Sequence, residues 1–179
     1  DLIRRRWLDN DFYGITYDLN YEASKVQATL GGAFNEYDGL HFGEVIWARY
    51  ASNGDIRHRW YESRSDKTDF NTYLKVNLQA TEQLNLFADA QIRTVHYRGK
   101  GTDNDLRTID FDHNYTFFNP KFGLTYNLSE QTALYGSFAV GNKEPNRSDI
   151  IDAVPGTAPS HETLNNIEFG FRKRTAKAA

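Results

Sequence analysis

Aromatic and cationic side chains are concentrated between residues 38 and 69 of the sequence. Aromatic rings provide rigid contact area for a ligand, and an arginine guanidinium can bind a carboxylate or a phosphate through two parallel hydrogen bonds. This segment is therefore a candidate ligand-binding region. The candidate residues in it are Trp47, Arg49, Tyr50, Arg57, His58, Trp60 and Tyr61.

The same segment also has a purely structural interpretation. Residues 45–50 and 56–61 have the composition of strands. Asn53, Gly54 and Asp55 between them suit the tip of a hairpin, because Asn-Gly favours a type I′ turn. We expect the segment to extend two neighbouring strands, while some of its side chains contact a ligand.

Residue types that could support catalysis or metal binding are scattered elsewhere. Residues 103–105 and 110–113 offer carboxylates for calcium, but the first group lacks the glycine and the distal glutamate of an EF-hand loop, so solvated loop carboxylates are the preferred interpretation. The five histidines form no HExxH motif, and the sequence has no phosphate-binding glycine loop, no GxSxG motif and no cysteine. We expect no catalytic site, no metal site and no cofactor.

Composition excludes several classes of protein. The net charge of -3 offers no basic excess for a nucleic-acid backbone, so no nucleic-acid partner is expected. No run of 18 apolar residues is present, which excludes a transmembrane helix. The mean hydropathy of -0.70 is low, yet 15% of the residues are aromatic. This combination is expected of a membrane β-barrel, because only alternate strand residues face lipid.

Alternating polarity is the dominant pattern, and it places successive side chains on opposite faces of a strand. Near 70–80, for example, Leu74 and Val76 alternate with Tyr73, Lys75 and Asn77. The pattern predicts seven strands, six of them in three hairpins, near 12–21, 26–37, 70–80, 84–97, 118–128, 134–140 and from about 164. The side chains expected to face a polar interior or a plug are Tyr73, Lys75, Asp89 and Arg93, and the last three suggest one charge network.

The connections between these strands are unequal in length. Short turns near 22–25, 81–83 and 129–131 alternate with long polar segments at roughly 38–69, 98–117 and 142–163. Outer-membrane barrels have short turns on the periplasmic side and long loops outside, and a strand of about ten residues can cross the bilayer when tilted. The predicted fold is all-β, an antiparallel up-and-down meander that forms part of a large outer-membrane β-barrel. All three short turns should lie at one end of an open sheet.

Two segments resemble the β-barrel of TonB-dependent receptors. Residues 138–149 resemble a strand end and the following loop in the later part of that barrel. Residues 162–172 are similar to the family's recurring P-E-x-x-x-x-x-E-x-G-x-R strand opening, with Ser160 and His161 where the proline is often found. The opening residues 2–14 look like receptors of this kind from Bacteroidetes.

The resemblance implies a 22-stranded barrel with an N-terminal plug. Such a receptor sits in the outer membrane of a Gram-negative bacterium and imports a siderophore, haem, cobalamin or a glycan with energy from TonB. The implied partners are outer-membrane lipid, the plug domain, TonB through the plug, and a small nutrient ligand. Asn146 and Arg147, in the first resembling segment, join the ligand-binding candidates.

We expect residues 1–179 to be an internal portion of such a barrel, without the plug and the remaining strands. No signal peptide opens the sequence, and its last residues look like a cut. Two other functions remain open. One is a porin-like or structural outer-membrane barrel segment, against which a plug in the parent protein would argue. The other is a soluble β-rich carbohydrate-binding module, which would bury its apolar faces in one compact core.

Overall fold

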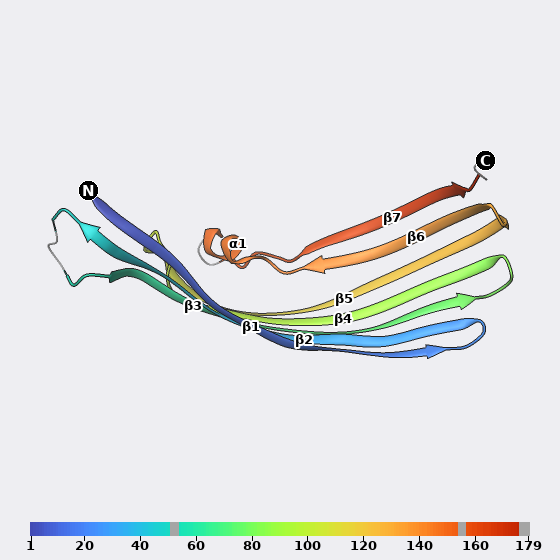
Figure 1. The fold of residues 1–179 in the computed structure, drawn as a ribbon, viewed down its shortest axis with the longest axis horizontal. Coiled ribbons are helices and arrows are strands. Elements are labelled where there is room, and N and C mark those ends of the chain that lie inside the picture. Colours follow the sequence, from blue (N-terminus) through green and yellow to red (C-terminus); the bar gives the residue numbers. More distant parts are fainter. Residues whose placement is uncertain (51–53, 154–156, 176–179) are drawn as a thin grey trace. The chain divides into compact units, whose positions relative to one another are not determined.

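The computed structural model describes residues 1–50, 54–153 and 157–175. Within them the chain forms strands and one short helix (Figure 1). The elements are β1 (Leu2–Glu22), β2 (Val26–Ala48), β3 (His58–Gln79), β4 (Leu84–Thr102), β5 (Thr108–Ser129), β6 (Thr132–Lys143), α1 (Arg147–Asp152) and β7 (Glu162–Lys173).

The seven strands form one sheet whose spatial order, β1 to β7, follows the sequence. Strands β5 and β6 pair antiparallel with Phe122 opposite Phe138, and β6 and β7 pair antiparallel with Phe138 opposite Ile167. The predicted all-β up-and-down meander is confirmed. Among the described residues β1 and β7 are the edge strands, as expected for an open sheet.

The chain divides into two compact units, and β1 to β5 contribute to both. Unit 1 comprises Asp1–Ile15, Phe34–Asp69 and Val95–Tyr115. Unit 2 comprises Thr16–Ala33, Phe70–Thr94 and Thr116–Ala179.

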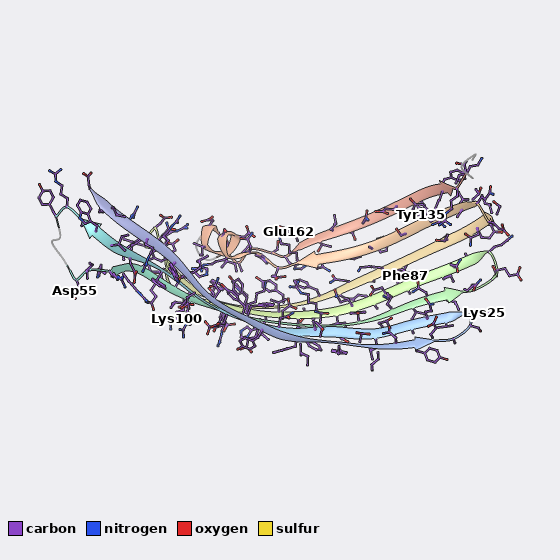
Figure 2. All side chains as sticks on the ribbon, in the orientation of Figure 1. Lys25, Asp55, Phe87, Lys100, Tyr135 and Glu162 are labelled. Atoms are coloured by element: carbon purple, nitrogen blue, oxygen red, sulfur yellow. The ribbon has the colours of Figure 1, made fainter. Side chains whose placement is uncertain are left out.

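Unit 2 contains the three short turns, and they lie at one end of its sheet (Figure 1). Lys25, labelled in Figure 2, lies in the first of them. Each turn also accepts a backbone hydrogen bond of 2.8 Å from a residue at or near the end of the next antiparallel strand of the sheet. Gln79 N, at the end of β3, donates to Lys25 O; Asn127 N of β5 donates to Gln83 O; and Arg174 N, directly after β7, donates to Gln131 O. The predicted arrangement of the turns is therefore confirmed.

The strands are longer than the sequence predicted. The first five have 19 to 23 residues, against the expected ten or so. The segments 38–69 and 98–117, predicted as long polar connections, are mostly strand, and only 49–57 and 103–107 lie between strands. The expected strands at 45–50 and 56–61 are confirmed for 45–48 and 58–61, whereas residues 49, 50, 56 and 57 lie outside the strands. Asn53 of the predicted hairpin tip lies outside the described residues.

Unit 2 leaves large apolar side chains exposed on one face of its sheet. Leu74 and Leu124 are each 49% exposed. An apolar groove of about 610 Å³ runs along this face, lined by Val76, Leu86, Leu124 and Phe138 among others. We call this surface the apolar face. It carries the side chains that the alternation of the sequence predicts for the apolar side of the strands.

Unit 1 also exposes apolar side chains, such as Leu8 and Phe12, but it buries others. Val95 and Ile109 are 1% and 2% exposed, and the ring of Tyr97 meets that of Phe111 edge-on at 5.0 Å. Phe111 lies directly over Gly99, where an added Cβ would collide with the ring, so a glycine is required at this close approach.

Candidate functional site

The polar face of unit 2 is the side of the sheet opposite the apolar face. Because side chains alternate along a strand, the neighbours of Val76 and Leu86, such as Asn77 and Phe87, belong to the polar face. Asn77 and Phe87 line a common groove. Four residues predicted to face a polar interior lie here, together with the groups that they bind. The polar-face residues used below are Tyr73, Lys75, Asn77, Asp89, Gln91, Arg93, Asn119 and Lys121.

Arg93 and Glu144 form the strongest polar contact of this face. Arg93 Nη1 donates to Glu144 Oε2 at 2.8 Å, and Nη2 donates to Oε1 at 3.1 Å. The Arg93 side chain is 22% exposed and that of Glu144 only 7%. Two parallel charge-assisted bonds with little access to water make a strong and directional pair.

A chain of hydrogen bonds accompanies this pair where β6 leaves β5. The buried Asn119 side chain donates to Gln91 Oε1 at 2.9 Å and accepts from the backbone nitrogen of Asn142 at 3.0 Å. Thr163 Oγ1 donates to Asn142 Oδ1 at 2.7 Å. The backbone pairing between β5 and β6 ends at Lys121 and Ala139. Beyond it, the Asn119 side chain replaces a backbone acceptor and satisfies the Asn142 N–H group.

The predicted charge network consists of separate parts. Asp89 pairs with Lys121 at 3.7 Å, whereas Arg93 pairs with Glu144. Lys75 and Tyr73 line a shallow groove with polar residues of β1 and β2, and the Tyr73 ring covers Gly31. Glu144 and Lys121 were not among the predicted site residues, because hydropathy alternation does not show which strands they would reach.

Asn146 and Arg147 lie at the start of α1. Asn146 Oδ1 accepts from Asp149 N at 3.0 Å, and Asp149 Oδ2 accepts from Asn146 N at 2.8 Å, so the helix begins with a reciprocal capping box. The sequence pattern predicts only a long polar connection at 142–163, so the helix is an addition to the expected fold. The sequence feature that indicates the start of this helix is Asn146 followed three residues later by Asp149, which is a variant of the capping-box pattern.

The candidates of the 38–69 segment fall into different environments within unit 1. Tyr61 is buried and meets Trp60 edge-on at 5.0 Å, and the Arg4 guanidinium lies 5.0 Å from the Trp60 ring centre. Tyr50 is 83% exposed with Arg49 above its ring. The remaining candidates are an exposed Trp47, an exposed His58 and Arg57, whose backbone nitrogen donates to Val45 O.

Three exposed side-chain pairs of unit 1 involve none of these candidates. The pairs are Arg64 with Asp38 at 3.8 Å, Arg98 with Asp66 at 3.5 Å, and His96 with Asp112 at 2.8 Å. In each pair both side chains are at least 40% exposed, so each contributes little to stability. Two of these pairs involve even-numbered residues of β3. The even-numbered positions of this strand are charged at 62–66 and mostly apolar at 70–78.

Asp103 organises the connection between β4 and β5. Its Oδ1 accepts from the backbone nitrogens of Asp105 and Arg107 at 2.9 and 2.8 Å, and its Oδ2 accepts from Arg107 Nε at 2.7 Å. Burial by itself raises the pKa of Asp103, but the hydrogen bonds and the charge of Arg107 outweigh burial and hold the pKa below its ordinary value. Both oxygens of the Asp103 carboxylate therefore accept hydrogen bonds within the turn.

Because the pKa of Asp103 is lowered in the folded state, its contribution to turn stability is full above the unfolded pKa, about 3.9, and is lost as pH falls through the folded pKa. We expect the exchange protection factors of the Asp105 and Arg107 amides to fall in that acidic range. Asp103→Asn should lower these factors at neutral pH and remove the acidic transition. Hydrogen–deuterium exchange of the parent protein measures both; identical pH profiles for the two proteins would contradict the assignment.

Two further observations bear on function. Among the described residues, no three His, Cys, Asp or Glu side chains are grouped so that they could hold a metal ion. No helix in the described part of the chain combines the length and the hydropathy needed to cross a membrane.

Several solved structures share the fold of this chain. The chain is similar to the copper transporter OprC, with a TM-score of 0.79 and 11% identity over 96% of this chain and 28% of that one. It is similar to the ferric citrate transporter FecA in the unliganded form, with a TM-score of 0.64 and 13% identity over 95% of this chain and 25% of FecA. For the siderophore receptor PiuA from Acinetobacter baumannii the TM-score is 0.66 and the identity 12%, over 93% of this chain and 29% of PiuA. The chain thus spans less than a third of each of these proteins.

A search of curated proteins gave no match to the chain. A family model described as TonB dependent receptor-like, beta-barrel matches residues 3–177. The family consists of transport receptors and not of enzymes, in agreement with the expectation from the sequence. Because the match extends over nearly the whole chain, the chain belongs to the TonB-dependent receptor-like β-barrel family.

Proposed function

We propose that residues 1–179 are an internal portion of the barrel of an outer-membrane receptor, which binds a scarce nutrient and imports it with energy from TonB. The plug domain and the remaining strands belong to other parts of the parent protein. The single observation that carries this proposal is the family match over residues 3–177. The nutrient is a siderophore, haem, cobalamin or a glycan.

The two faces of unit 2 support a place in the outer membrane. Burial of apolar surface is worth about 25 cal/mol per Å², so a wall of exposed leucine and phenylalanine side chains is costly in water and favourable against lipid. The opposite face carries ion pairs and amides, which suit a lumen filled by water or a plug. A soluble carbohydrate-binding module would instead bury the apolar face in its core.

Unit 1 offers the ligand-binding surface of this proposal. Tyr50 with Arg49, and Trp60 with Arg4, combine an aromatic ring with a guanidinium, which suits an anionic or planar nutrient. Trp47, Arg57, His58 and Tyr61 of the same unit complete this proposed surface. Asn146 and Arg147 of unit 2 are separate candidates for contact with the nutrient.

Uptake by cells that carry or lack the parent gene tests the proposal. Radiolabelled ferric citrate, a ferric catecholate, haem and cobalamin form the probe panel, supplied at nanomolar concentration and at 100-fold excess. We expect loss of saturable uptake of one probe on deletion of the gene, and the same loss when TonB is inactivated. Uptake that is non-saturable and independent of TonB would overturn the proposal in favour of the porin-like alternative.

A further inference from the structure

The pair of Arg93 and Glu144 joins strands that are not neighbours. Arg93 belongs to β4 and Glu144 directly follows β6, while β5 lies between them in the sheet. Sheet pairing therefore does not require this contact. It links the chain that follows β6 to β4 across the intervening β5, on the polar face of unit 2.

Several other contacts fix the same segment. Glu144 and Pro145 are both buried, and Asn142 bonds to Asn119 through its backbone nitrogen and its side-chain amide. Further along the chain, the His161 ring meets the Phe117 ring edge-on at 5.4 Å. The capping box gives the short helix α1 a defined start. Unlike the exposed charge pairs of unit 1, the Arg93–Glu144 pair has little water around it to compete for its bonds.

We propose that Arg93 and Glu144 form a latch that holds residues 142–153, the α1 segment, in one position over the polar face of unit 2. The segment then keeps one conformation against the polar face and does not move as an external loop. Arg93 and Glu144 act as positioning residues, because they set where α1 lies and need not touch a ligand. The latch follows from the geometry of unit 2 and does not depend on the proposed transport function.

The consequence for function does rest on that proposal. A nutrient that passes along the polar face meets the α1 segment in a single conformation while the latch is closed. Opening the latch releases the segment and widens the range of positions that α1 can occupy.

Pulsed electron spin resonance on the full-length parent receptor in lipid vesicles tests the latch. Residues 1–179 contain no cysteine, so Ser148→Cys on α1 and Glu130→Cys in the turn between β5 and β6 introduce the labels in this region. Any cysteine elsewhere in the parent is first replaced. We expect a narrow distance distribution with Arg93 and Glu144 present, and at least a twofold broader one in Arg93→Ala and in Glu144→Ala.

Two further variants separate a latch from general loosening of the fold. The swapped pair, Arg93→Glu with Glu144→Arg, should restore the narrow distribution, because it restores the attraction. Lys121→Ala, which breaks the more exposed pair with Asp89 on the same face, should leave the distribution narrow. Each variant is measured only after its folded barrel band is seen on an unheated gel; Glu144→Gln replaces Glu144→Ala if that variant does not fold. Narrow distributions in both single variants, or a broad one in Lys121→Ala, would overturn the latch.

Discussion

Leu74→Arg should destabilise the intact receptor by roughly 2–4 kcal/mol, the cost of placing a cation on the lipid side of a barrel near the midplane. Leu74 lies on the apolar face, in the middle of the part of β3 that belongs to unit 2, and is 49% exposed. In lipid, the arginine must either lose its hydration or draw water into the bilayer. The free energy of unfolding, measured by urea titration of the receptor in lipid vesicles, reports the change.

Asn77→Arg is the matched control on the same strand. Asn77 lies on the polar face and is exposed, so water or polar groups of a plug can solvate the new charge. We expect a cost well below that of Leu74→Arg. Equal costs for the two variants would mean that the assignment of the faces, and with it the contact with lipid, is wrong.

Ile109→Asp should cost about 3–5 kcal/mol, the range measured when a buried charge is left without a partner. Ile109 is 2% exposed within unit 1, so the carboxylate would have almost no access to water. The aspartate also removes the apolar contacts that the isoleucine makes. The same urea titration measures the loss.

Asn114→Asp places the same carboxylate on the exposed side of the same strand. Asn114 lies beyond Asp110 and Asp112, which are already tolerated as exposed acids on β5. A change within about 0.5 kcal/mol is expected, as for most surface substitutions. A cost for Asn114→Asp that approaches that of Ile109→Asp would show that unit 1 does not bury the face to which Ile109 belongs.

The fold of unit 2 is predictable from the sequence, because one face of its sheet is apolar. On β3, β4 and β5 within unit 2, the alternation of leucine or phenylalanine with polar residues marks each strand, and the short turns between strands are too brief for anything but a hairpin. This pattern was sufficient for the number of strands, their order, and the faces of Leu74 and Lys75.

In unit 1 the same signal is weak, because the strands carry polar groups on both faces. Glu62, Ser63, Arg64 and Ser65 follow one another in β3, and two of them are buried serines. Hydropathy alternation disappears there although the strand continues, so the sequence pattern predicts a loop for these residues. The position of a strand in a sheet of this kind depends on neighbours that are distant in the sequence.

The partners of individual side chains were the least predictable part. Alternation puts Arg93 on the polar side of its strand, but its bond to Glu144 depends on how the chain turns after β6. Asn146 and Arg147 were proposed from a resemblance, and the capping box that engages Asn146 became visible only in the structure. Whether either residue contacts a nutrient stays a prediction.

The tight turns of unit 2 also have an evolutionary consequence. Because side chains alternate with a period of two, inserting one residue into β3 or β4 would exchange the faces of every residue between the insertion and the next turn. Insertions and deletions should therefore be rare in these strands and in the turns that join them. Variation in length should instead accumulate in the connection between β2 and β3 and in the part of the chain between α1 and β7, where an inserted epitope tag would also be tolerated best.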